Sequence, residues 1–107
     1  MTLNDRRPST LLVALLMATS GSALANEALA RKNECFACHS VANPVVGPAY
    51  RAVAAKYAGH ADAEDQLVRS IREGSSGKWG DIPMPPHPKL SEQDAHRLAK
   101  WILALPK

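Results

Sequence analysis

The chain has 107 residues, enough for one small domain. Its 13 basic and 10 acidic residues give a net charge of +3 at neutral pH. A nucleic-acid-binding domain needs a concentrated basic stripe, which this sequence lacks. Only two cysteines are present, so several disulfides cannot substitute for a hydrophobic core. The composition therefore argues against both a nucleic-acid-binding domain and a disulfide-rich domain.

The first 25 residues have the pattern of a secretory signal peptide. Arg6 and Arg7 form a positive start, residues 11–18 are uniformly apolar, and residues 23–25 form an A-x-A cleavage site. The apolar run is far shorter than the roughly 20 residues that span a bilayer. We expect cleavage after Ala25, one domain over residues 26–107 and a periplasmic location. An uncleaved N-terminal anchor is the weaker alternative.

A short helix capped by Asn26 is predicted to begin at Glu27 and to lead into a Cys-x-x-Cys-His motif at Cys35, Cys38 and His39. This motif is the attachment site of a c-type haem. On helical turns the three side chains stand at i, i+3 and i+4, so they share one face. The two thiols can form thioethers with the haem vinyl groups, and the imidazole can bind the iron. The motif predicts one covalently attached haem c.

Three other uses of a Cys-x-x-Cys pair compete with haem attachment. A thioredoxin-like dithiol requires a βαβ context, and no strand-like alternation surrounds the motif. A zinc site requires four suitably spaced ligands, which His60, His87 and His96 do not supply. A simple short-loop disulfide is the third alternative. The adjacent His39 and the export signal favour haem attachment.

Three further helices are predicted where apolar residues recur at helical spacing. The second begins at Pro48 and ends at Gly59. Asp62 caps the third, and Ser91 caps the fourth, which Pro106 ends. The apolar faces of these helices contain Tyr50, Val53, Ala54, Tyr57, Leu67, Val68, Ile71, Ala95, Leu98, Ala99, Ile102 and Leu105. The predicted fold class is all-α, with about four helices wrapped around one haem.

Residues 75–89 form a long loop that contains four prolines and cannot be a helix or a central strand. Met84 lies in this loop and is the only methionine after residue 25. A lone methionine can simply fill a gap in the core, but an aperiodic loop has no helical face to fill from. We therefore favour Met84 as the second iron ligand. His87 is the competing ligand, whereas His60 and His96 are expected at the surface.

The two tryptophans have different expected environments. Trp101 lies on the last helix and is expected in the core. Trp79 lies in the loop, and its indole N–H needs an acceptor if it is buried. A haem propionate would be such an acceptor, and partial exposure of the ring is the alternative.

Short segments spread over residues 26–107 together resemble one protein family. These segments are Cys35-x-x-Cys38-His39, Gly47-Pro48-Ala49-Tyr50, Val53-Ala54-Ala55-Lys56, Gly77-x-Trp79-Gly80, Ile82-Pro83-Met84-Pro85-Pro86 and Leu98-Ala99-Lys100-Trp101. They are similar to the bacterial class I monohaem cytochromes c of the cytochrome c-551 type. The combination is far more specific than the Cys-x-x-Cys-His motif alone.

The resemblance implies roles for individual residues. His39 and Met84 would be the axial ligands of the iron, and the Pro48 carbonyl would accept a hydrogen bond from the His39 ring. Trp79 would donate a hydrogen bond to a haem propionate. The chain departs from the family at two positions. Ser70 stands where a basic or histidine side chain often holds the propionate, and His87 stands where an asparagine often follows the Pro-Met-Pro-Pro run.

These expectations indicate a soluble periplasmic one-electron carrier rather than an enzyme, because both axial positions of the iron are filled. The alternative is a haem enzyme or gas sensor with a labile sixth ligand, and a subunit of a larger complex is a third possibility. The resemblance implies a bc-type donor and a terminal oxidase, nitrite reductase or peroxidase as acceptor. We expect a monomer whose partners dock at an exposed haem edge framed by Phe36, Ala37, Val45, Pro85 and Pro86.

Overall fold

The structure is a computed structural model that describes residues 20–107. This part of the chain contains the helices α1 (Ser20–Lys32), α2 (Tyr50–Tyr57), α3 (Ala63–Glu73) and α4 (Glu92–Leu103). A short 3₁₀ helix, η1 (Cys35–Ala37), follows α1. The predicted all-α class is confirmed. Most of the predicted signal peptide falls in residues 1–19, outside the described residues.

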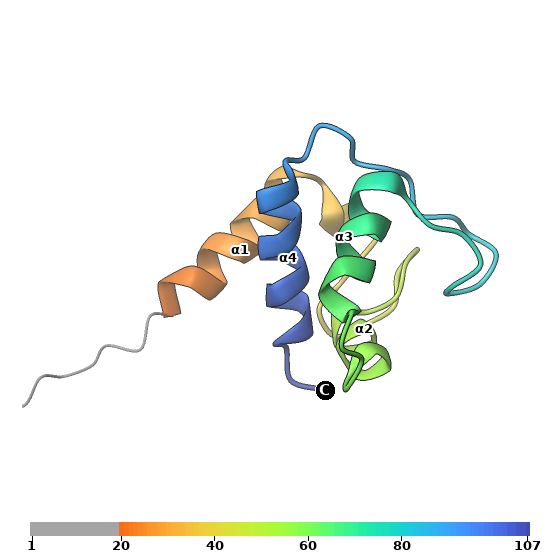
Figure 1. Ribbon diagram of the computed structural model, residues 1–107, viewed down its shortest axis with the longest axis horizontal. Helices are drawn as coiled ribbons and strands as arrows, with labels where there is room; N and C mark the ends of the chain where they lie inside the picture. Colours follow the sequence, from red (N-terminus) through yellow and green to blue (C-terminus); the bar gives the residue numbers. More distant parts are fainter. Residues whose placement is uncertain (1–19) are drawn as a thin grey trace, which may run out of the picture.

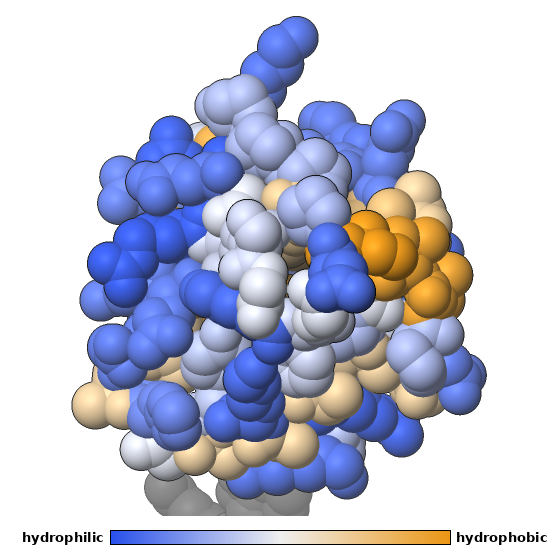
Figure 2. All heavy atoms as spheres, turned by 90° about the vertical axis from the view of Figure 1, so that its right-hand side faces the viewer, coloured by the Kyte–Doolittle hydropathy of each residue, from blue (hydrophilic) through white to orange (hydrophobic). Residues whose placement is uncertain are grey.

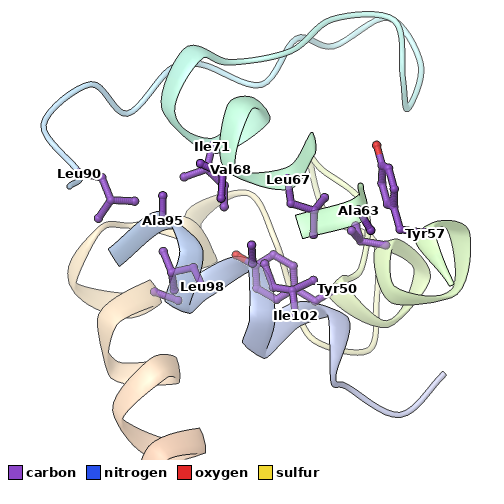
Figure 3. Close-up of a cluster of buried hydrophobic side chains, with 13 residues drawn as sticks. Tyr50, Tyr57, Ala63, Leu67, Val68, Ile71, Leu90, Ala95, Leu98 and Ile102 are labelled. Carbon is purple, nitrogen blue, oxygen red and sulfur yellow. The ribbon is translucent and has the colours of Figure 1, made fainter. Parts of the chain in front are cut away.

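Helix α4 is the central element, because α1, α2 and α3 all pack against it (Figure 1). Its inner face includes Ala95 and Ala99, both fully buried, whose small side chains allow close approach of the neighbouring helices. The labelled apolar side chains of α2, α3 and α4 meet between these helices (Figure 3). The loop that joins α3 to α4 extends away from this bundle (Figure 1).

Helix α1 begins at Ser20, so the prediction of a helix start at Glu27 is wrong. Alanine and leucine within residues 20–26 favour helix, and a cap at Asn26 has no effect while helical residues precede it. The helix is followed by Glu34, whose φ of 59° lies in the left-handed region. Such a residue interrupts the helical path, so α1 and η1 are separate elements.

Helix α2 begins at Tyr50, two residues after the predicted start at Pro48. Ala49 precedes the helix with φ −59° and ψ 141°, which is an extended conformation. The Tyr50 amide donates to the Ser40 carbonyl over 2.9 Å, so the preceding loop satisfies the first amide of the helix. The predicted inner face, with Tyr50, Val53 and Tyr57, is buried as expected.

Helices α3 and α4 begin after the predicted caps, but only one cap acts through its side chain. The Ser91 hydroxyl accepts a hydrogen bond from the Asp94 amide over 3.1 Å. Asp62 makes no such side-chain bond, and its carboxylate accepts instead from the Gln66 amide group over 2.8 Å. That hydrogen bond lowers the pKa of Asp62. Gly74, with φ 80°, ends α3 as predicted.

Two side chains predicted on the fourth helix differ from their predicted environments. His96 was expected to face water, but it is half-buried, with Nδ1 3.6 Å from a carboxylate oxygen of Glu64 on α3. Leu105 lies beyond the last helical residue, Leu103, and is only partly buried. Trp101 is partly buried against the core, where its ring meets that of Tyr50 edge-on at 5.6 Å.

Candidate haem site

The Cys-x-x-Cys-His motif forms a tight turn rather than the α-helix that its spacing suggested. Cys35 begins η1, and its carbonyl accepts hydrogen bonds from the amides of Cys38 over 3.2 Å and His39 over 3.0 Å. The three side chains that could hold a haem therefore come from one turn of chain. All three line the same cleft. The predicted sharing of one face is thus present in a different local conformation.

His39 is held in one orientation by its surroundings. Its Nδ1 lies 2.8 Å from the Pro48 carbonyl oxygen, which can only accept, so Nδ1 carries the proton. The other ring nitrogen, Nε2, then keeps a lone pair for a metal ion. The Tyr50 ring stacks on the imidazole with a centroid distance of 4.9 Å and an interplanar angle of 19°. The imidazole is therefore oriented before any ligand is added.

Gly47 is a functional residue that sequence reasoning missed. A Cβ at this position would lie 2.6 Å from Cε1 of His39, which is too close for any larger residue without displacement. The Gly47 amide also donates to the Cys38 carbonyl over 2.7 Å. The sequence signal was the Gly47-Pro48-Ala49-Tyr50 segment, in which only Pro48 was given a role.

The surroundings of the attachment turn are apolar enough to alter acid–base behaviour. Burial raises the pKa of the Cys35 thiol. Burial, followed by the neighbouring Cys35, raises the pKa of Tyr50 far above its ordinary value.

Met84 lines the cleft from the loop between α3 and α4. Its backbone forms an isolated antiparallel bridge with Ser75, with N–H···O distances of 2.8 and 3.1 Å. A Cβ on Gly74 would lie 2.7 Å from the Met84 carbonyl oxygen, so the glycine allows close approach of the two loop segments. The half-buried Met84 side chain packs against the hydrophobic core. The loop is therefore positioned by backbone contacts as well as by its prolines.

His87 lies in the same loop and is tied to α3. Its Nδ1 lies 3.2 Å from the Ile71 carbonyl oxygen, and its backbone amide donates to the same oxygen over 3.0 Å. The half-buried ring also lines the cleft. One of its two ring nitrogens is therefore engaged with the end of α3.

Trp79 lies near the tip of the loop and is 42% exposed. Its ring is covered by Lys56, whose Nζ lies 4.3 Å from the ring centroid, a cation–π contact. Trp79 also lines the cleft. The predicted alternative of partial exposure describes this ring, and Lys56 is a neighbour that the sequence analysis did not identify.

The cleft itself fits a flat apolar cofactor. It encloses about 1110 Å³ when space open to solvent is included. Most of its lining residues are apolar and come from η1, the following loop, three helices and the Met84 loop. Cys35 and Cys38 do not form a disulfide with each other, which fits their use for haem attachment. Among residues 20–107, no three His, Cys, Asp or Glu side chains gather to hold a metal ion, which argues against the zinc alternative.

Comparison with known proteins decides the family. The family model of cytochrome c matches residues 23–106. This chain belongs to the cytochrome c family. Cytochrome c-552 of Nitrosomonas europaea is 54% identical, covering 86% of this chain and 87% of the relative. Cytochrome c-551 of Pseudomonas aeruginosa is 46% identical, covering 90% of this chain and 91% of the relative.

The fold of this cytochrome agrees with that of a solved relative. The crystal structure of Nitrosomonas europaea cytochrome c552 superposes with a TM-score of 0.72 at 54% identity. The match covers 74% of this chain and 98% of that chain. The protein is therefore a class I monohaem cytochrome c of the c-551 type, a small electron carrier with one covalently bound haem c.

Proposed function

We propose that this cytochrome is a soluble periplasmic one-electron carrier whose haem is held by Cys35, Cys38, His39 and Met84. The two cysteines form the thioether bonds, and His39 and Met84 are the axial ligands. The supporting observation is that His39, with Nδ1 bonded to Pro48 and Nε2 left for a metal, lines the same cleft as Met84. The bound haem supplies one-electron chemistry at its iron.

During electron transfer, the residues around the haem keep its surroundings rigid. The Pro48 carbonyl keeps the His39 ring in one tautomer. Prolines on both sides of Met84 and its bridge to Ser75 reduce the freedom of the loop. Little rearrangement then accompanies oxidation or reduction. With both axial positions filled, no site is open for a substrate, so we propose a carrier rather than an enzyme.

The periplasmic location rests on the N-terminal sequence. Arg6 and Arg7, the apolar residues 11–18 and the A-x-A site ending at Ala25 have the order of a secretory signal. Cleavage there removes the first part of α1 and leaves the residues from Asn26 onward as the domain. No helix in residues 20–107 is long and apolar enough to cross a membrane.

Redox partners are proposed to dock over an exposed apolar face beside the cleft. Val45, Val46 and Ile82 have more than half of their surface exposed, at 60%, 51% and 63%. Figure 2 shows a strongly hydrophobic area on a mostly hydrophilic face. The proposed partners are a bc-type donor and an oxidase, nitrite reductase or peroxidase acceptor, met by a monomeric cytochrome.

One member of the expected docking face, Phe36, is partly buried, and its ring packs against the core. The lining of the cleft does not include Phe36, Ala37, Val45 or Pro86. The Phe36 ring meets the Tyr50 ring edge-on at 5.9 Å and is covered by the Arg31 guanidinium at 4.5 Å. Phe36 therefore joins α1 to the core, and its contact with a partner stays a prediction.

Optical spectroscopy of the native protein and Met84→Ala tests the proposed ligation. The native ferric protein should show the weak far-red charge-transfer band of sulfur on iron, and its ferrous form should not bind carbon monoxide. Met84→Ala should lose the band and bind carbon monoxide at neutral pH, because His87 is held at the Ile71 carbonyl.

Met17→Ala is the matched control, because cleavage after Ala25 removes that methionine. This variant should behave as the native protein does. Ready carbon monoxide binding by the native ferrous protein would favour the alternative, a haem enzyme or gas sensor with a labile sixth ligand.

A further inference from the structure

The cleft has one cationic side chain. Lys78 is the only Lys or Arg among the described residues that line it, and no Asp or Glu lines it. Ser70, Ser75, Ser76 and Trp79 add hydroxyl and indole groups from the end of α3 and the adjoining loop. The rest of the lining is largely apolar. A haem is an apolar ring that carries two carboxylates, so its acidic groups require a polar region of this kind.

Contacts with α3 and α2 hold the Lys78 segment in place. The Lys78 ammonium lies 3.3 Å from the Ser70 hydroxyl on α3. The Lys78 carbonyl accepts a hydrogen bond from the Lys56 ammonium over 2.8 Å. Lys56 also covers the ring of Trp79, the next residue of the loop. The position of the Lys78 ammonium therefore follows from contacts on both sides of the loop.

The other Lys, Arg, Asp and Glu side chains near this region are engaged elsewhere or lie outside the cleft, and the titratable ring of His87, which lines the cleft, is engaged at the Ile71 carbonyl. On α3, the Arg72 guanidinium donates to the Leu90 carbonyl over 3.2 Å. On α2, the Lys56 ammonium is committed to Trp79 and to the Lys78 carbonyl. Arg69 and Glu73 of α3 and Asp81 of the loop do not line the cleft.

We propose that the Lys78 ammonium binds a haem propionate, with the Ser70 hydroxyl orienting the ammonium toward it. Ser70 carries no charge of its own, so Lys78 of the loop supplies the positive charge at this place. The inference rests on the proposed attachment at Cys35, Cys38 and His39, which places the haem in this cleft. Lys78 is thus a positioning residue for the cofactor and sets the charge beside it.

The consequence is a propionate that stays ionised at neutral pH. A cation within about 4–6 Å lowers a carboxyl pKa by about 1 to 3. Oxidation adds positive charge at the iron and lowers the propionate pKa further. The reduction potential therefore falls with rising pH only between the ferric and ferrous pKa values of the propionate. With Lys78 present that interval lies below the neutral range, so the potential is flat near pH 7.

The test compares the native holoprotein with Lys78→Gln, Lys78→Arg and the control Lys89→Gln, an exposed lysine of the same loop outside the cleft. Potentials are measured from pH 4 to 9, and propionate pKa values are measured by NMR with ¹³C-labelled haem. Lys78→Gln should raise the pKa of this propionate by about 1 or more in both the ferric and the ferrous protein. The pH interval over which the reduction potential falls should then move toward neutral pH. Lys78→Arg and Lys89→Gln should keep the native values.

Propionate pKa values that are the same in Lys78→Gln and Lys89→Gln would overturn the proposal. The far-red band of each variant is recorded alongside. If the native protein shows the band but Lys78→Gln leaves the propionate pKa values unchanged, only the proposed contact between Lys78 and the propionate is wrong. A native protein without the band contradicts the ligation proposed above.

Discussion

Gly47 and Pro48 hold the His39 imidazole from two sides. The Pro48 carbonyl fixes the proton on Nδ1, and the missing Cβ at Gly47 leaves room for Cε1. The motif at 35–39 predicts His39 as an iron ligand, but the ring orientation depends on Gly47 and on Pro48, which lies nine residues after His39. The imidazole is therefore positioned by residues 47–48 as much as by its own turn.

We expect Gly47→Ala to move His39. The added methyl group would lie 2.6 Å from the ring, so the imidazole or the loop must shift, at a cost of about 1–3 kcal/mol. The holoprotein should lose stability in guanidinium denaturation, and its Soret and far-red bands should change because the iron–imidazole geometry changes.

Gly59→Ala is the matched control for this prediction. No heavy atom lies within 4 Å of a Cβ there, but φ is 79°, so strain alone costs about 1 kcal/mol. Its spectrum should be native. If Gly47→Ala has a native spectrum and the same small loss, the steric role of Gly47 is wrong.

His87 holds the loop at the last turn of α3. We expect His87→Ala to remove a side-chain hydrogen bond worth about 1 kcal/mol. The fraction of molecules in which Met84 has left the iron should then rise about fivefold. Binding of external imidazole to the ferric protein, which competes with Met84, should strengthen by that factor. His60→Ala, at an exposed turn position, is the control and should leave imidazole binding unchanged. Equal affinities in the two variants would exclude an anchoring role.

At the scale of elements, α3 and α4 differ in how their first turns are capped: a side chain caps α4 but not α3. We expect Ser91→Ala to destabilise the holoprotein by about 1 kcal/mol, because the Asp94 amide loses its acceptor. Asp62→Ala should cost less, since the Asp62 side chain caps no amide of α3. Denaturant unfolding followed by circular dichroism measures both. A larger loss for Asp62→Ala would contradict this difference between the caps.

The helices were predictable where apolar residues recur at helical spacing and a capping or helix-ending residue marks a boundary. The inner faces of α2, α3 and α4 follow the spacing in the sequence, and Gly74 and Ser91 mark boundaries by their own chemistry. The start of α2 was not predictable, because the extended conformation of Ala49 depends on loop contacts. The left-handed Glu34 also had no signal, since glutamate rarely adopts that conformation.

The site was predictable to the level of residue types but not of contacts. From their spacing and composition, the sequence predicted Cys35, Cys38, His39 and Met84 as the residues that hold the haem, and the structure places these four along one cleft. The sequence did not identify the stacking of Tyr50 on His39 or the cover of Trp79 by Lys56. These contacts join residues from different segments, so no local pattern encodes them.

At the scale of the whole molecule, the cofactor completes a small core. A domain of this size buries only about 60% of the surface exposed by its unfolded chain, and it commonly needs an additional stabilising group. The cleft between the helices and the Met84 loop is lined mainly by apolar side chains. We expect the covalently attached haem to cover this surface and so to stabilise the fold.

The exposed apolar face predicts how charge affects partner binding. We expect Val45→Lys to slow electron transfer to a purified bacterial terminal oxidase several-fold, because an ammonium group must be desolvated in the contact. The reduction potential should not change. Gln93→Lys adds the same charge at an exposed position of α4 that is not part of this apolar face, and it should keep the native rate. A native rate for Val45→Lys would exclude this face.

The central claim, a His39–Met84 haem in a processed periplasmic protein, is tested most directly by NMR of the ferrous protein purified from periplasm with ¹³C-methyl methionine. Cleavage after Ala25 leaves Met84 as the sole methionine, so one methyl resonance is predicted. Ligation places this methyl group over the haem ring, whose ring current should shift it far upfield. A single methyl resonance at the ordinary position of a methionine would contradict the account.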